Sequence, residues 1–204
     1  MKTIPHAWGL LAATLGLAGC YLPLSSKVES EREIGRRSAP EAVILHRVVR
    51  QHIISPLEPL SDEKIGHNYL VRHQYFLRRG DTEQRLEFLE VGFRGFTDPK
   101  KRVEEVEQRV LPIAGTTSWI AVRAVKVHRP YVDLEIIVFD DDLRQRLTVL
   151  EGVHRQRPVL SRAYLVGLNY IDSLRLENGN RQVVYQTDKG RFALDPLTFA
   201  VTRR

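Results

Sequence analysis

The sequence predicts a mainly β fold, with α+β as the alternative: an antiparallel sandwich or a small barrel with one or two short helices. Several segments alternate apolar and polar residues with a period of two, as half-buried strands do. Short turn-forming stretches rich in Gly, Asn, Asp or Pro separate these segments. Strands and helices do not alternate regularly along the chain, so a doubly wound parallel sheet is not expected.

Residues 41–54 form the first element, and two interpretations of them stay open. Ser38 and Glu41 have the spacing of a capping box, and an apolar set at helical spacing follows, namely Leu45, Val48, Val49 and Ile53. The same segment is rich in β-branched residues, which favours a strand. We lean slightly towards a helix.

The next stretch predicts a hairpin followed by a helix. Residues 68–77 and 84–93 are expected to be strands on either side of the polar connection RRGDTE. The Arg-Gly-Asp triplet at 79–81 falls in that connection, where Gly and Asp favour a turn, so we assign it no adhesive role. Residues 97–112 predict a helix with capping residues, a first-turn proline and one narrow valine face.

A second β region is clearer, with strands expected at 119–128, 131–140 and 143–152. In the middle strand one face carries Val132, Leu134, Ile136 and Val138, with Asp133 and Glu135 opposite. In the third strand, Arg144, Arg146 and Thr148 alternate with Leu143, Gln145, Leu147 and Val149. Further on, Asn178-Gly179 predicts a tight turn between two short β-prone runs.

The N-terminus carries the features of an export signal. A run of 13 small or apolar residues, broken only by Thr14, extends from Ala7 to Gly19 and is too short to span a bilayer. It ends in Leu17-Ala18-Gly19-Cys20, and Cys20 is the only cysteine of the chain. This order resembles the lipobox of bacterial lipoproteins. The resemblance implies recognition of Leu17, Ala18 and Gly19 by signal peptidase II and a diacylglyceryl group on the Cys20 thiol.

The lipobox resemblance also implies an organisation and a location. Residues 1–19 would be a removed signal peptide, 20–40 a lipidated flexible tether, and 41–204 one β-rich globular domain. Two or three acyl chains anchor a protein stably without a membrane span. Tyr21, rather than aspartate, follows the cysteine, which in Gram-negative lipoproteins implies the outer membrane, here facing the periplasm. No cofactor is expected beyond the covalent lipid.

The charge balance suggests one alternative function. The formal net charge is +6, and arginine supplies most of the 31 basic residues. Guanidinium groups pair phosphates well, so a polyanion or lipid-surface site is one hypothesis. Its candidate contacts are Arg144, Arg146, Arg155, Arg157 and Arg162. Basic and acidic residues are interspersed, and no nucleic-acid-binding motif occurs, so nucleic acid is not an expected partner.

No motif in the sequence identifies a catalytic or metal site. The aspartates at 140–142 are consecutive, and a calcium loop needs spaced ligands, so we expect a solvated loop. The seven histidines form neither an HxH nor an HExxH pattern, and no GxSxG, SxxK or Gly-rich phosphate loop occurs. An envelope hydrolase would need a site assembled only by folding, for example beside His128 or His154.

The sequence therefore favours a non-enzymatic function. We expect an envelope lipoprotein, attached to the membrane by its lipid, that binds or helps to assemble another envelope protein. Polyanion binding and a fold-assembled hydrolase are the alternatives. The oligomeric state is not indicated.

Overall fold

The computed structural model describes residues 22–54, 68–96, 110–128, 130–154 and 173–204. In these residues the chain is mainly β, with strands β1 to β13 and one short 3-10 helix, η1 (Glu87–Leu89). The chain divides into two compact units. The first unit comprises residues 1–30, 47–74 and 90–103, and the second comprises 31–46, 75–89 and 104–204.

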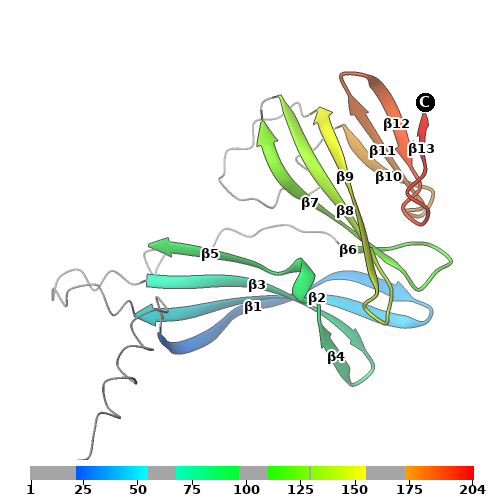
Figure 1. Ribbon diagram of the computed structural model, residues 1–204. Helices are drawn as coiled ribbons and strands as arrows, with labels where there is room; N and C mark the ends of the chain where they lie inside the picture. The colour runs from blue at the N-terminus through cyan, green and yellow to red at the C-terminus, as the bar shows by residue number, and fades with distance from the viewer. Residues whose placement is uncertain (1–21, 55–67, 97–109, 129, 155–172) are drawn as a thin grey trace, which may run out of the picture. The chain divides into compact units, whose positions relative to one another are not determined.

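The strands form three antiparallel sheets, and Figure 1 labels them in chain order. Sheet A contains β1 (Leu22–Ser38), β2 (Glu41–Ile54), β3 (Asn68–Arg79), β4 (Thr82–Arg85) and β5 (Val91–Phe96). Sheet B contains β6 (Val110–Pro112), β7 (Trp119–His128), β8 (Tyr131–Phe139) and β9 (Gln145–His154). Sheet C contains β10 (Leu174–Glu177), β11 (Gln182–Thr187), β12 (Gly190–Leu194) and β13 (Val201–Arg203). Among the described residues no sheet closes on itself, consistent with a sandwich.

The slight preference for a helix over residues 41–54 is wrong, because this segment is strand β2. Its β-branched residues fit a pleated surface, and pairing with both β1 and β3 outweighs the local capping signal. The flexible tether expected over residues 20–40 is also corrected, because Leu22–Ser38 form strand β1. Its polar residues are consistent with an exposed edge strand, which needs few apolar side chains.

The predicted hairpin is confirmed, but its second strand is divided. β3 pairs with β4 from Phe76↔Arg85 to Arg79↔Thr82, and Gly80, with φ of 53°, makes the turn. After η1, β5 pairs with the earlier part of β3, from Asn68↔Phe96 to His73↔Val91. The helix expected over 97–112 lies outside the described residues up to 109, and its last three residues form β6.

Two hydrophobic cores within the second unit explain why sheet B is so apolar. The predicted face of β8 (Val132, Leu134, Ile136, Val138) is confirmed and packs against sheet C residues such as Val183 and Leu194. We call this the first core. The second core lies on the opposite face of sheet B, where Trp119, Ile137 and Phe139 meet β2, β3 and η1. Because both faces are covered there, Ile136–Phe139 are buried without alternation.

The Asn178-Gly179 turn is confirmed, and it also holds sheet C against sheet B. Both residues have positive φ, as does Asn180, so the loop between β10 and β11 has the left-handed conformation that favours Asn and Gly. The Gly179 carbonyl accepts a hydrogen bond from the Ala114 N–H at 2.8 Å. Asn180 donates to the Pro112 carbonyl at 2.8 Å, and Arg181 donates to the Ala114 carbonyl at 2.7 Å.

The first unit contains parts of β1, β2 and β3 together with β5. Val48, Val71 and His73 are buried in it. Arg50 Nε lies 3.4 Å from Glu29 Oε1, so an ion pair joins β2 to β1.

Candidate functional site

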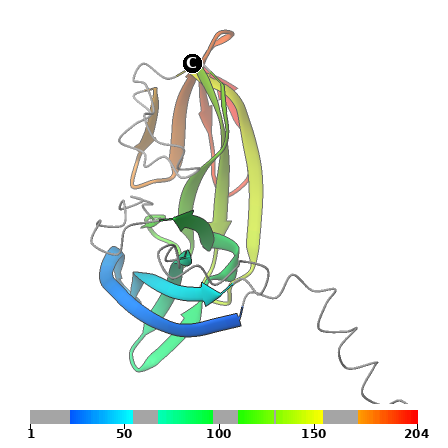
Figure 2. The ribbon, with the colours of Figure 1, turned by 90° about the vertical axis from the view of Figure 1, so that its left-hand side faces the viewer.

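The candidate site begins with β9, which is the edge strand of sheet B. Among the described residues β9 pairs with β8 alone, and Figure 2 shows it, in yellow, at the margin of its sheet. The sequence predicts the alternation of this strand, yet Leu147 and Val149 are 54% and 45% exposed. Leu150 and Val153 instead face the first core. A pair of exposed apolar side chains on an edge strand is a feature that soluble monomers usually avoid.

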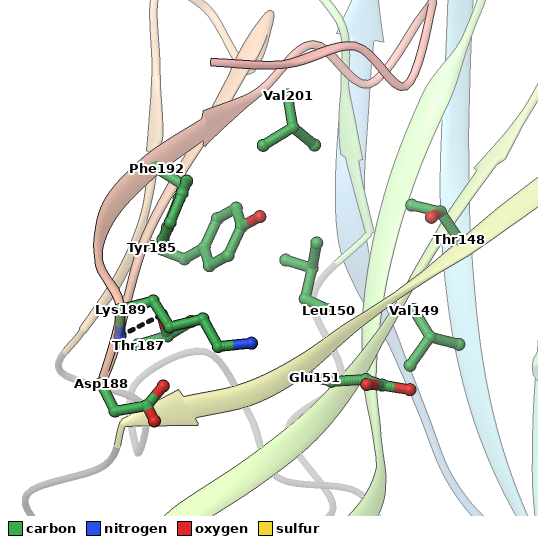
Figure 3. Close-up of a pocket in the computed structure, with 10 residues that line it drawn as sticks. All are labelled: Thr148, Val149, Leu150, Glu151, Tyr185, Thr187, Asp188, Lys189, Phe192 and Val201. Carbon is green, nitrogen blue, oxygen red and sulfur yellow. Dashed lines mark hydrogen bonds between the residues drawn. The ribbon is translucent and has the colours of Figure 1, made fainter. Parts of the chain in front are cut away.

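A groove of about 320 Å³ lies alongside this strand within the second unit. We call it the β9 groove. Thr148, Val149, Leu150 and Glu151 of β9 line one wall. Sheet C and its β11–β12 turn supply the other wall: Tyr185, Thr187, Asp188, Lys189, Phe192 and Val201 (Figure 3). The edge strands of both sheets, β9 and β13, therefore border one depression.

The floor of the groove is apolar and aromatic. Leu150 and Tyr185 belong to the first core, and Phe192 packs against it. The Tyr185 and Phe192 rings are stacked, with centroids 5.7 Å apart and 27° between their planes. Val201 on the rim is 50% exposed. A ligand in the groove would therefore contact the core of the sandwich directly.

Polar groups lie at the rim of the groove. Glu151, Asp188 and Lys189 are exposed, and the Lys189 N–H donates to Thr187 Oγ1 at 3.1 Å, which orders the β11–β12 turn. Burial raises the pKa of the Tyr185 hydroxyl, so this group is a neutral hydrogen-bond donor at physiological pH. An apolar floor with a few polar groups at its edge is the usual composition of a binding site.

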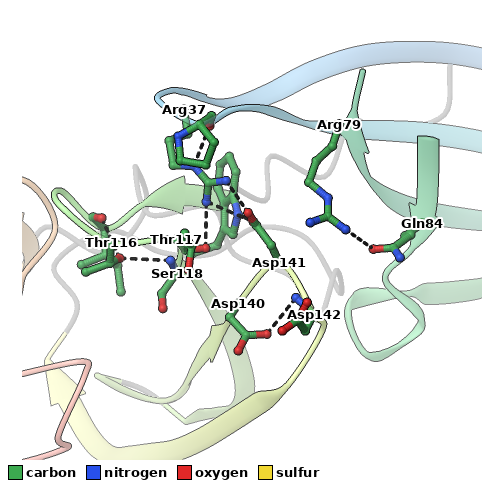
Figure 4. A network of polar contacts seen from close by, with 12 residues as sticks. Arg37, Arg79, Gln84, Thr116, Thr117, Ser118, Asp140, Asp141 and Asp142 are labelled. Atoms are coloured by element: carbon green, nitrogen blue, oxygen red, sulfur yellow. Dashed lines mark hydrogen bonds and ion pairs between the residues drawn. The ribbon is translucent and has the colours of Figure 1, made fainter. Parts of the chain in front are cut away.

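A second polar cluster lies elsewhere in this unit and is buried. Arg37 of β1 pairs with Asp141: Nη1 is 3.0 Å from Oδ1, and Nη2 is 2.5 Å from Oδ2 (Figure 4). The same guanidinium donates to the carbonyls of Pro40 and Thr117 at 2.9 and 2.7 Å. Trp119 Nε1 donates to Asp141 Oδ1 at 3.1 Å, and the Trp119 ring lies beneath Arg37 at 5.1 Å.

This cluster satisfies its own charges. Burial alone would raise the pKa of Asp141, but the hydrogen bonds from Arg37 and Trp119 outweigh burial and hold that pKa below its usual value. Both carboxylate oxygens have donors, and the guanidinium has four acceptor contacts. We therefore interpret the pair as structural, because it fastens β1 to the loop between β8 and β9.

The aspartates at 140–142 do not converge on one position. Asp140 Oδ1 accepts from the N–H groups of Asp142 and Arg144, both at 3.0 Å, and Asp142 forms an ion pair with Arg144. Asp141 is buried in the Arg37 cluster, so the expectation of a fully solvated loop is wrong for this residue. Within the described part of the chain, no group of three or more His, Cys, Asp or Glu residues has the arrangement of a metal site.

The histidines singled out for a hydrolase lie at the far end of sheet B. His128 Nε2 is 3.0 Å from Asp133 Oδ1, and the Gly152 N–H donates to the same oxygen at 2.9 Å. Burial opposes ionisation of Asp133, but these two contacts hold its pKa below the usual value. The Tyr131 ring lies between His128 and His154, with centroid distances of 6.0 and 5.9 Å. Ser173 donates its hydroxyl to the His154 carbonyl, so its proton is directed at the backbone rather than at an imidazole.

The arginines of the polyanion hypothesis are only partly described. Arg144 forms ion pairs with Asp140 and Asp142, and Arg146 donates to the Leu197 carbonyl at 2.6 Å and lies over the Phe199 ring. Arg155, Arg157 and Arg162 lie outside the described residues, as do Cys20 and the preceding Leu17, Ala18 and Gly19. The shared arginine face therefore stays a prediction.

Sequence reasoning did not find the groove. Its walls come from β9 and from sheet C, which are far apart in the chain, and none of its residues belongs to a motif. The one signal in the sequence was the apolar pair Leu147 and Val149 on one face of a predicted strand. That pair indicates an exposed apolar surface only once β9 is known to be an edge strand. No helix in the described residues is both long enough and apolar enough to cross a membrane.

Comparison with known proteins adds no further assignment. No family model, curated protein or solved structure matches the chain significantly.

Proposed function

We propose that this chain is a lipid-anchored protein of the bacterial envelope whose folded part binds another envelope component, as a non-enzymatic accessory of assembly or transport. The lipobox-like order ending in Cys20 supports the anchor, and Tyr21 after it favours the outer membrane, with the folded part in the periplasm. The β9 groove is the proposed binding surface.

One observation carries the binding role. Leu147 and Val149 are 54% and 45% exposed on the face of edge strand β9 that points away from sheet C, and Val201 is 50% exposed on edge strand β13 at the groove rim. Exposing Leu147 and Val149 side by side on one face of an edge strand has a solubility cost, and exposed apolar patches mark interaction sites. The aromatic floor provides contact area of the kind that dominates binding energy at interfaces.

The binding role is tested by recovery of partners from cells. Full-length tagged protein would be purified from membranes with Leu147 and Val149 both replaced by Asp. The matched control is Val125→Asp on β7, because Val125 is also exposed, at 43%, but does not line the groove. We expect the double variant to lose a protein that both the wild type and the control retain. Equal recovery of every bound protein by all three forms would contradict the proposal.

The anchor is tested separately. Cys20→Ser removes the thiol that would carry the diacylglyceryl group, so acyl labelling should disappear and the protein should leave the membrane fraction. Unchanged labelling and fractionation would show that the N-terminus is not a lipobox.

A further inference from the structure

We propose that the β9 groove recognises its partner by strand addition: an extended segment of another protein pairs antiparallel with β9 and becomes the next strand of sheet B. This inference rests on the proposed binding function and specifies the chemistry of the partner. The partner segment has apolar residues at alternate positions, a basic residue near its start and an acidic residue near its end.

The backbone of β9 suits this role. From Gln145 to Leu150 the pairing of the strand with β8 is regular, and among the described residues its outer edge pairs with no other strand. Gly152, with φ of 63°, and the register shift between Val132 and Leu134 end the regular stretch. Six residues of regular edge backbone, Gln145 to Leu150, are therefore available, and an unpaired edge of that length is a template for another strand.

The side chains on both faces of this edge favour a polypeptide over a compact ligand. On one face Leu147 and Val149 are exposed at i and i+2, the spacing that matches alternate residues of a paired strand. On the other face Thr148 and Leu150 point into the groove, towards Tyr185, Phe192 and Val201. An added strand places its own alternate side chains on both surfaces at once, covering the exposed valine and leucine and filling the groove.

The charges along β9 set the direction and the sequence of the partner. Arg146, which also donates to the Leu197 carbonyl, stands near the start of the regular stretch, and Glu151 directly follows its end. Asp188 and Lys189 of the β11–β12 turn line the groove with Glu151 and carry opposite charges, so Glu151 is the charge of β9 itself at this end (Figure 3). In an antiparallel pair the start of the partner strand lies beside Glu151 and its end beside Arg146. Opposite charges facing each other across strands stabilise the pair, and like charges destabilise it. A basic-to-acidic segment is therefore selected over the reverse order.

The test uses a synthetic probe peptide, acetyl-Lys-Thr-Val-Ile-Val-Glu-Thr-amide, binding to the full-length lipidated protein in nanodiscs. Two further peptides have the same sequence and carry N-methyl groups on the third and fifth residues or on the fourth and sixth. Because alternate N–H groups of a strand point to opposite edges, only one of these sets can bond to β9. We expect one methylated peptide to bind about tenfold more weakly or worse and the other to bind like the parent.

Three results would overturn strand addition. They are equal binding by both methylated peptides, tighter binding of a peptide with Lys and Glu exchanged, and binding of dodecanoate with no binding of the parent peptide. The Val149→Asp variant should bind the parent peptide weakly, whereas Val125→Asp should bind it normally. If the membrane purification still shows a partner that depends on Leu147 and Val149, these results reject the recognition mode and leave the binding function in place.

Discussion

Charged side chains are usually exposed and large apolar side chains are usually buried. The buried Arg37–Asp141 cluster and the β9 groove depart from this rule in opposite directions. In the cluster two charges are buried, at 6% and 12% side-chain exposure, and every charged group has partners. In the groove, aliphatic side chains are exposed, and their strand has one free edge among the described residues. Buried polar groups and exposed apolar groups are the informative exceptions: here the buried charges satisfy each other, and the exposed apolar side chains are the ones that we propose contact a partner.

The largest expected effect tests whether the buried cluster is structural. Asp141→Asn leaves the Arg37 guanidinium buried without its counter-charge, which should lower the free energy of unfolding by about 3–5 kcal/mol. Asp142→Asn, one residue along, is the control, because Asp142 is exposed and pairs with the exposed Arg144. Thermal and urea unfolding would measure both. Equal stability of the two variants would mean that the buried pair fastens nothing.

Protonation of Asp141 at low pH should weaken the same ion pair. The resulting loss in the free energy of unfolding should not exceed the loss caused by Asp141→Asn. The pKa of Asp141 is lowered in the folded protein, so its ion pair contributes full stability above the unfolded-state pKa, which lies near 4. That contribution is lost as the pH falls through the lower folded-state pKa. Unfolding measured from pH 6 downwards should show a steeper loss of stability in the wild type than in Asp141→Asn. Parallel curves would contradict this assignment.

A smaller effect is expected from the glycine that lets β1 approach sheet B. A Cβ atom on Gly35 would lie 2.1 Å from the Val110 carbonyl oxygen, and this contact with backbone cannot be relieved by a rotamer change. Gly35→Ala should therefore destabilise the protein by about 1–3 kcal/mol. In Gly92→Ala the nearest atom is Leu70 Cδ1 at 3.8 Å, an ordinary contact, so stability should hardly change. The two melting temperatures provide the comparison.

The smallest effect on stability is expected at the groove. Val149→Thr should change the free energy of unfolding by no more than about 0.5 kcal/mol, because Val149 is 45% exposed. The same replacement at Val138, 3% exposed in the first core, buries a hydroxyl and should cost about 1–3 kcal/mol. Chemical denaturation of both variants tests this. A large loss at Val149 would place that residue in the core rather than on a binding surface.

Local patterns in the sequence were enough to predict the middle of the fold. The alternation in β8, the hairpin around Gly80 and the turn at Asn178-Gly179 each depend on neighbouring residues. β1 and β2 were missed because pairing between strands decided their structure: β1 pairs with β2, and β2 also pairs with β3. Their local signals, polar composition in one and a capping box in the other, favoured other conformations.

The candidate sites depend on contacts that no local pattern contains. Arg37 and Asp141 are 104 residues apart, and nothing near either residue indicates the other. The groove likewise joins Val149 to Val201 across two sheets. The sequence did predict that Leu147 and Val149 lie on one face of a strand, but whether that face is buried follows from where the strand lies in its sheet.

Site-specific photocrosslinking in living cells tests the central claim most directly. A benzoylphenylalanine placed at Val149 should form a covalent adduct with one envelope protein, and the same group at Val125 should not form that adduct. The adduct should disappear when an excess of the probe peptide is added to the isolated membranes. Adducts that are identical at the two positions, or absent at Val149, would contradict the assignment of the β9 groove as the binding surface.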